Sequence, residues 1–140
     1  MSDTVPSVKL THEGALKILR AAIDKAKAMG QPQCIAIVDD GGHLLAFTRM
    51  DGAKVLSIDS CMKKAMTAAS SRVPTGGVAA DVEVKLAHAT GGKLTNLKGG
   101  VPIVVDGHAI GAVGVGSGTG EQDLEVAKAG IAALPGAKAW

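Results

Sequence analysis

The sequence predicts an α+β fold in which α-helices pack on an antiparallel β-sheet. Two similar stretches, CIAIVDDGGHLLAF and VPIVVDGHAIGAV, each run from an apolar strand through an Asp-Gly turn to a histidine and a second apolar strand. Each stretch is followed by a segment with apolar residues at helical spacing. Two hairpins with their helices predict one sheet covered by helices. The length fits a single domain, residues 1–140.

The first helix is predicted over residues 12–29, before the first hairpin. Thr11 can cap its beginning, and Gly30 is a natural end. Its predicted apolar stripe consists of Leu16, Leu19, Ile23 and Ala26. Its predicted solvent-facing side consists of Lys17, Arg20, Asp24 and Lys27.

The remaining elements are predicted in the same way, strands from short apolar runs bounded by turns and helices from apolar residues at helical spacing. Strands are predicted at residues 33–39, 43–49, 102–105 and 108–115. Further helices are predicted at residues 55–70, 81–89 and 121–134. The buried face of the helix at 55–70 is predicted to consist of Val55, Ile58, Met62, Ala65 and Ala69. The rest of the segment 71–98 is rich in loops.

Both faces of the first predicted strand are apolar. Ile35 and Ile37 point to one face of the sheet. The opposite face receives Cys34, Ala36 and Val38. Because a sheet with one wet face would alternate apolar and polar residues, we expect both faces to be covered. Other helices or a second subunit are the candidates for the second face, and we predict a homo-oligomer.

Composition argues against nucleic-acid and membrane partners. Aromatic residues make up 1% of the chain and the net charge is +2, so base-stacking platforms and a strong positive field are both missing. The apolar runs are too short to span a bilayer, and residues 1–10 lack the pattern of a signal peptide. Together with two isolated cysteines, Cys34 and Cys61, this predicts a cytoplasmic protein with reduced thiols.

A glycine-rich run, GVGSGTG, precedes the last predicted helix and is the first candidate ligand site. Free backbone N–H groups at a helix start attract anions, which makes Gly116, Ser117 and Gly118 candidate ligand-binding residues. The run lacks the lysine of a phosphate-binding loop, and Glu121 and Asp123 put negative charge at the helix start. A structural turn and a ligand contact therefore both stay open.

His12 is the candidate metal ligand among the four histidines. It shares a helical line with Leu16, Leu19 and Ile23, so its ring is predicted to lean toward the packed face of the helix. Two interpretations stay open: a partly buried histidine satisfied by hydrogen bonds, or a ligand to haem iron or another metal. No histidine or cysteine spacing indicates a dedicated zinc site.

The stretch RMDGA and the lysine pair that follows provide candidate catalytic residues. Arg49 can bind the Asp51 carboxylate and lock the turn, or it can bind an acidic group of a small ligand. Lys64 precedes Ala65 of the predicted stripe, so it is expected to lean toward the core. A desolvated lysine can act in acid–base chemistry, and a lysine that reaches back to water is the structural alternative.

The motifs taken together resemble those of the GlcG/HbpS-like family, which includes the C-terminal domain of PduO-type proteins. The resemblance rests on IVDDGGHLLAFTRMDGA, KKAMTA and GGVPIVVDGHAIGAVGVGSGTGEQDLEVAKAG, and it covers the chain nearly from end to end. It implies a profilin-like fold with α/β/α layers and assembly into homo-oligomers, from tetramers to octamers. Many relatives have Gly-Val-Ser-Gly where this chain has Gly114-Val115-Gly116-Ser117, which moves the hydroxyl group.

The resemblance implies haem binding in some members and a glycolate, diol or aromatic catabolic setting in others. Three functions are therefore weighed. The first is an oligomeric small-molecule-binding protein that holds haem or a related cofactor, with His12 on the iron. The second is a small cofactor-independent isomerase, hydratase or lyase acting on a carboxylated catabolite, with Arg49, Asp51 and Lys64 as catalytic candidates. The third is an accessory partner of a neighbouring enzyme.

Overall fold

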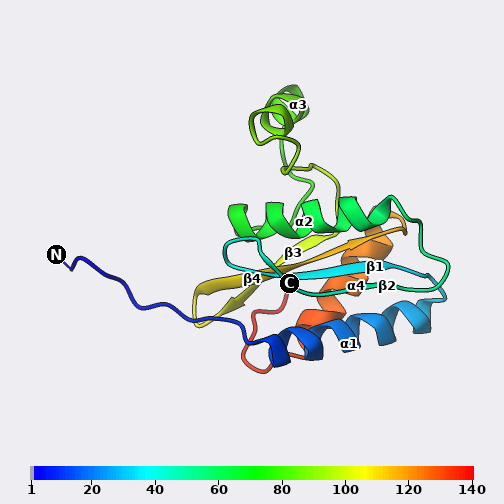
Figure 1. The fold of residues 1–140 in the computed structure, drawn as a ribbon, viewed down its shortest axis with the longest axis horizontal. Helices are drawn as coiled ribbons and strands as arrows, with labels where there is room; N and C mark the ends of the chain where they lie inside the picture. Colours follow the sequence, from blue (N-terminus) through cyan, green and yellow to red (C-terminus); the bar gives the residue numbers. More distant parts are fainter. Residues whose placement is uncertain (1) are drawn as a thin grey trace.

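The computed structural model describes residues 2–140, which form four helices and four strands (Figure 1). The helices are α1 (His12–Met29), α2 (Ser57–Ser71), α3 (Ala80–Ala89) and α4 (Gly120–Ala132). The strands are β1 (Cys34–Asp39), β2 (Leu44–Arg49), β3 (Gly100–Val105) and β4 (His108–Gly116). Every predicted element is present, with shifts of one or two residues at most ends. Within residues 2–140, no helix is long and apolar enough to cross a membrane.

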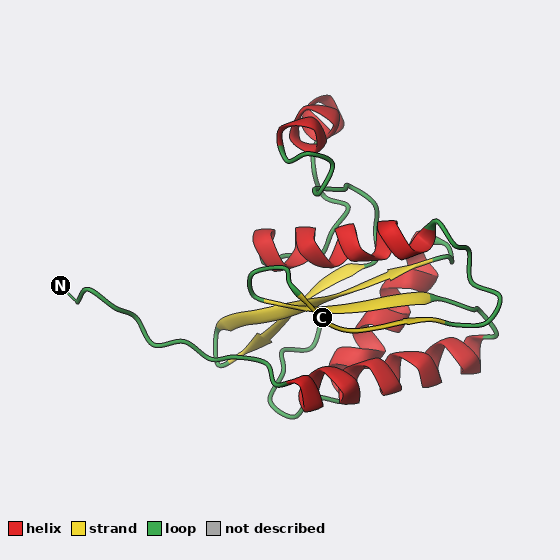
Figure 2. Cartoon of the chain, in the orientation of Figure 1, coloured by secondary structure: helices red, strands yellow, loops and turns green. Residues whose placement is uncertain are grey.

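The strands form one antiparallel sheet in the order β2-β1-β4-β3. The two hairpins lie side by side because β1 of the first pairs with β4 of the second. Helices α1 and α4 cover one face of the sheet, and α2 covers the other (Figure 2). This arrangement confirms the predicted α+β class and its α/β/α layers.

The core is divided by the sheet into two clusters. Ile35 and Ile37 of β1 pack toward α1 and α4, together with Ile18 and Val126. On the other face, small side chains of β1 and α2 pack together: Cys34, Ala36, Val38, Cys61 and Ala65. The predicted assignment of β1 residues to two buried faces is therefore confirmed. Since α2 covers the second face from within the chain, that face does not itself require a second subunit.

Helix α1 has the predicted ends, but its buried face is rotated from the prediction. The Thr11 hydroxyl accepts a hydrogen bond from the Gly14 N–H at 3.0 Å, and Gly30 ends the helix with φ 68°. Leu16 is 50% exposed, so its place in the predicted stripe is wrong. Leu19 and Ala26 of the predicted stripe are buried and Ile23 is partly buried, while Ala15, Ile18 and Ala22 complete the buried face. The shift arises because α4 lies close against the alanine side of α1, where small residues let the two backbones approach.

Helix α2 buries Ala65 and Ala69 of its predicted face and partly buries Met62, but the two large residues predicted at its beginning are not buried. It begins at Ser57, so Val55 lies in the preceding turn and is 61% exposed, while Ile58 lies at the exposed edge of the helix. A Cβ atom added to Gly114 of β4 would collide with the carbonyl group of Cys61. The glycines of β3 and β4 thus let α2 lie directly on the sheet, where most of its buried residues are small.

Helix α3 projects from the body on two connecting segments (Figure 1). We call residues 72–98 the α3 arm. The Asn96 side chain closes the arm by donating to Val78 O at 2.8 Å and Glu83 Oε2 at 2.7 Å. None of the residues of α3 is buried, and Val84 is 75% exposed. Because an isolated helix of this length is marginally stable in water, the hydrogen bonds of Asn96 help to hold the arm together.

Candidate functional site

A buried ion pair joins α2 to the beginning of α4. Lys64 Nζ donates to Asp123 Oδ2 at 2.9 Å and to the Val115 carbonyl at 2.8 Å. The two side chains are 6% and 3% exposed. The second carboxylate oxygen of Asp123 accepts from the Gly118 N–H at 3.0 Å. Lys64 therefore lies in the core, as its place beside Ala65 predicts, and it fixes the glycine run through Asp123.

The glycine run leads into the start of α4, where side chains accept hydrogen bonds from some of the free backbone N–H groups. The Thr119 hydroxyl accepts from the Gln122 N–H, and Gln122 Oε1 accepts from the Thr119 N–H at 2.9 Å, which is a capping box. Among the described residues, the next two N–H groups, those of Gly120 and Glu121, have no hydrogen-bond acceptor. These two groups give the start of α4 a partial positive charge.

A cavity of about 230 Å³ lies against the ion pair and this helix start. We call it the Lys64 cavity. Its polar lining comes from five different segments of the chain and includes Lys54, Lys64, Lys98, Ser57, Ser60 and Ser117. The Ser117 Oγ accepts from the Lys54 N–H at 2.9 Å, which ties the loop after β2 to the end of β4. The cavity is therefore basic and rich in hydroxyl groups.

Only some of the predicted site residues meet at this cavity. Lys64, Ser117 and Gly118 line it, and Gly116 is buried beside Ser57 and Ser60. Arg49 and Asp51, the other two catalytic candidates, do not line it.

The register of the sheet explains why Arg49 and Asp51 stay outside. Cys34 of β1 separates Arg49 of β2 from Gly116 of β4. Arg49 and Asp51 are exposed, and no ion pair joins them among the described residues. The predicted ionic lock of the turn is therefore absent from the structure of residues 2–140.

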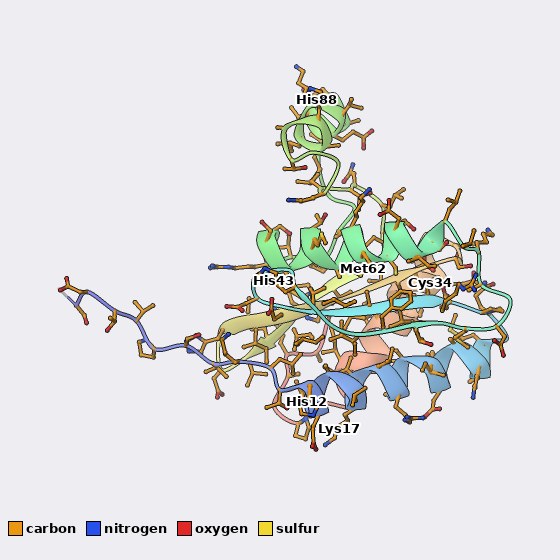
Figure 3. All side chains as sticks on the ribbon, in the orientation of Figure 1. His12, Lys17, Cys34, His43, Met62 and His88 are labelled. Atoms are coloured by element: carbon orange, nitrogen blue, oxygen red, sulfur yellow. The ribbon has the colours of Figure 1, made fainter. Side chains whose placement is uncertain are left out.

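His12 lies on α1, on the opposite face of the sheet from Met62 of α2, the helix that carries Lys64 (Figure 3). It is exposed at the first position of α1, so the prediction that its ring leans toward the packed face is wrong. The rotation of the buried face of α1 moves His12 and Leu16 together onto an exposed flank of the helix. Figure 3 also places His43 and His88 on other elements, away from His12.

Several residues of the cavity were not expected from sequence, although one signal pointed to some of them. Ser57, Ser60 and Lys64 recur at the spacing of one helix face, so they could have been grouped by the period that identified α2. Lys54 and Lys98 had no such signal. They reach the cavity only because loops distant in sequence fold over the same end of the sheet.

The two cysteines are packing residues. Cys34 and Cys61 are both buried and free, on the face of the sheet that α2 covers. Burial raises the pKa of the Cys61 thiol to about 12 and also raises the pKa of Cys34. Because the thiolate is the nucleophile, neither side chain is suited to nucleophilic chemistry at neutral pH.

Comparison with known proteins places this fold in a family. The family model described as "Haem degrading protein HbpS-like" matches residues 10–132. Protein GlcG of Escherichia coli K12 is 44% identical over 109 residues, which cover 77% of this chain and 81% of GlcG.

Two solved structures have the same fold over almost the whole chain. A crystal structure of a PduOC–haem complex has a TM-score of 0.85 at 29% identity, covering 94% of this chain and 98% of that one. A double mutant of HbpS from Streptomyces reticuli has a TM-score of 0.84 at 33% identity, covering 96% and 92%. The motifs, the layered fold and these similarities agree, and the chain belongs to the HbpS-like family.

Proposed function

We propose that the protein is an oligomeric small-molecule-binding protein that holds haem between subunits, with His12 as the ligand to the iron. The observation that carries the proposal is the position of His12, exposed on a flank of α1 beside the exposed Leu16. Similarity to the solved PduOC–haem complex over 94% of this chain supports the choice of haem. Bound haem supplies an iron centre capable of redox chemistry.

The residues around His12 fit one side of a haem site. Among the described residues, the His12 side chain makes no hydrogen bond or ion pair, so a ring nitrogen can coordinate iron. By contrast, His43 Nδ1 lies 3.3 Å from Asp39 Oδ1. Leu16, one turn after His12, offers apolar surface to a macrocycle, and the partly buried Ile23 continues that surface. A second subunit would supply the cover that this exposed flank lacks.

We expect titration of the protein with haem to give a saturable shift of the Soret band, and His12→Ala to abolish that shift. The reason is that alanine removes the imidazole that binds the iron and leaves the fold intact, since His12 is exposed. Visible absorbance measures the band, and circular dichroism checks the fold of the variant.

His43→Ala and His88→Ala are the matched controls, because both histidines are exposed and lie on other elements. Both variants should keep the wild-type band position and affinity. A band unchanged in His12→Ala would remove His12 as the ligand. Loss of the band in His43→Ala alone would assign the iron to the turn after β1.

Oligomerisation is supported by apolar surface that one chain leaves open. In the α3 arm, Val84 and Leu86 are exposed on a helix with no buried residue. On the body, the main contacts of α2 are with β1, β3 and β4, so the edge strand β2 is the least covered part of its face. We take this exposed apolar surface as support for an interaction site. A second copy of the chain is the partner that we propose.

We expect the wild-type protein to be an oligomer in light scattering after size exclusion, and the double variant Val84→Lys with Leu86→Lys to dissociate. Lysine side chains cannot be buried in an interface without loss of hydration. Because no residue of α3 is buried, the fold of the body should be unchanged by circular dichroism. A monomeric wild-type protein, or an oligomer that survives the double variant, would contradict the role given to the arm.

The catabolic setting and the cytoplasmic location stay predictions. An enzyme that uses Arg49, Asp51 and Lys64 together is not proposed, because only Lys64 of the three lines the Lys64 cavity.

A further inference from the structure

The ammonium group of Lys64 has one N–H more than the chain can satisfy. An ammonium has three donors, and the acceptors of Lys64 Nζ are Val115 O and Asp123 Oδ2. Among the described residues no third acceptor is present, although the side chain is 6% exposed and lines the cavity. Buried polar groups are normally paired, so the third donor indicates an acceptor supplied from outside the chain.

The cavity carries one positive charge in excess. Asp123 neutralises Lys64 at 2.9 Å, and Glu121 neutralises Lys98 at 2.6 Å. Among residues 2–140, Lys54 has no carboxylate within ion-pair distance. A ligand with one negative charge would therefore make the cavity electrically neutral.

Neutral donors surround the same space. The Ser117 hydroxyl already accepts the Lys54 N–H, so its own hydrogen is available to donate. Ser57 adds a second hydroxyl to the cavity wall, and Gly120 brings the N-terminal end of α4 to it. Hydrogen bonds from charged and neutral donors to one carboxylate are the strong kind, because the acceptor is ionised.

A buried amide beside the cavity is also without partners. Gln33 is fully buried, and neither its Nε2 nor its Oε1 has a hydrogen-bond partner among the described residues. A Cβ placed on Gly118 would lie 2.8 Å from Gln33 Nε2, so the amide packs against a residue that lines the cavity. Unpaired buried amides are rare in folded proteins, which marks this end of the sheet as a polar binding region.

We propose that the Lys64 cavity binds a small monocarboxylate, held by Lys64, Lys54 and Ser117 at the start of α4. The single excess charge favours a monoanion over a phosphate dianion. The volume of about 230 Å³ is below the range typical of sites for drug-sized ligands, which restricts the ligand to a short organic acid. This site is separate from His12 and does not depend on haem binding.

Propionate is the probe for the test, observed by saturation-transfer difference NMR on the full-length protein. We expect a saturable signal in the wild type and about tenfold weaker binding in Lys54→Gln, which removes the charge that no carboxylate neutralises. Lys54 is exposed, so this variant should fold as the wild type does. Inorganic phosphate at the same concentration and ionic strength should displace little propionate.

The matched control is Lys63→Gln, which also removes one positive charge, but at a residue of α2 that does not line the cavity. Its propionate affinity should equal that of the wild type. The proposal is overturned by a wild-type signal that does not saturate, or by equal weakening in Lys54→Gln and Lys63→Gln. If phosphate displaced propionate with an affinity equal to that of propionate, the cavity would be a general anion site and not a carboxylate site.

Discussion

Replacing Lys64 with methionine is expected to lower the free energy of unfolding by about 3–5 kcal/mol. The substitution leaves the Asp123 carboxylate buried without a countercharge, and it removes the donor to the Val115 carbonyl. An uncompensated buried charge costs far more than the net stabilisation that an ion pair provides. Equilibrium denaturation in urea, followed by circular dichroism at fixed protein concentration, measures the loss.

A double variant separates the stability lost through an unpaired buried charge from the stability lost through a change in core packing. Lys64→Met with Asp123→Leu removes both charges, and most of the lost stability should return, because apolar pairs of similar volume often replace a buried ion pair without loss. Lys63→Met serves as the control on the same helix, since Lys63 pairs with Asp59 at the surface. A double variant no more stable than Lys64→Met would mean that the pair is needed for its geometry.

Gly114→Ala is expected to cost about 3 kcal/mol or more and to reduce the yield of folded protein, because overpacking here meets backbone and not a flexible side chain. A Cβ at Gly114 would collide with the Cys61 carbonyl and lie 2.5 Å from the Ala65 N atom. Helix α2 would have to move away from β4, which would open the buried cluster that α2 forms with Cys34 and Ala36 of β1. Thermal unfolding of the soluble fraction gives the comparison with the wild type.

Gly77→Ala is the matched glycine control. A Cβ at Gly77 meets no atom within 4 Å, and the residue does not have a left-handed backbone. Its stability should stay within about 0.5 kcal/mol of the wild type, as for most surface substitutions. Equal losses in the two variants would mean that the contact between α2 and the sheet is not what makes Gly114→Ala destabilising.

The sequence predicted the elements well because their signals are local. Thr11 and Gly30 marked the ends of α1, and alternating side chains assigned Ile35 and Cys34 to opposite faces. The buried faces of the helices were harder to predict. Large apolar residues such as Leu16 dominate a helical pattern, whereas close helix packing selects alanine and glycine, which carry little signal.

The site was predictable only where its residues share one element or one motif. Lys64 and the Ser117–Gly118 pair came from patterns within α2 and the glycine run. Lys54 and Ser117 are 63 positions apart, and no periodicity connects them. His12 was selected by a helical line, but its exposure depends on how α4 packs against α1, which one sequence does not specify.

The Lys64–Asp123 ion pair has a consequence for how the chain acquires its structure. Lys64 belongs to the hairpin–helix unit that ends with α2, and Asp123 belongs to the second such unit, which ends with α4. A half chain containing only the first unit would hold a lysine in its core with no carboxylate, and its β1 would lack the β4 neighbour. Neither repeat is self-sufficient, so the two halves of the sheet fold as a single cooperative unit.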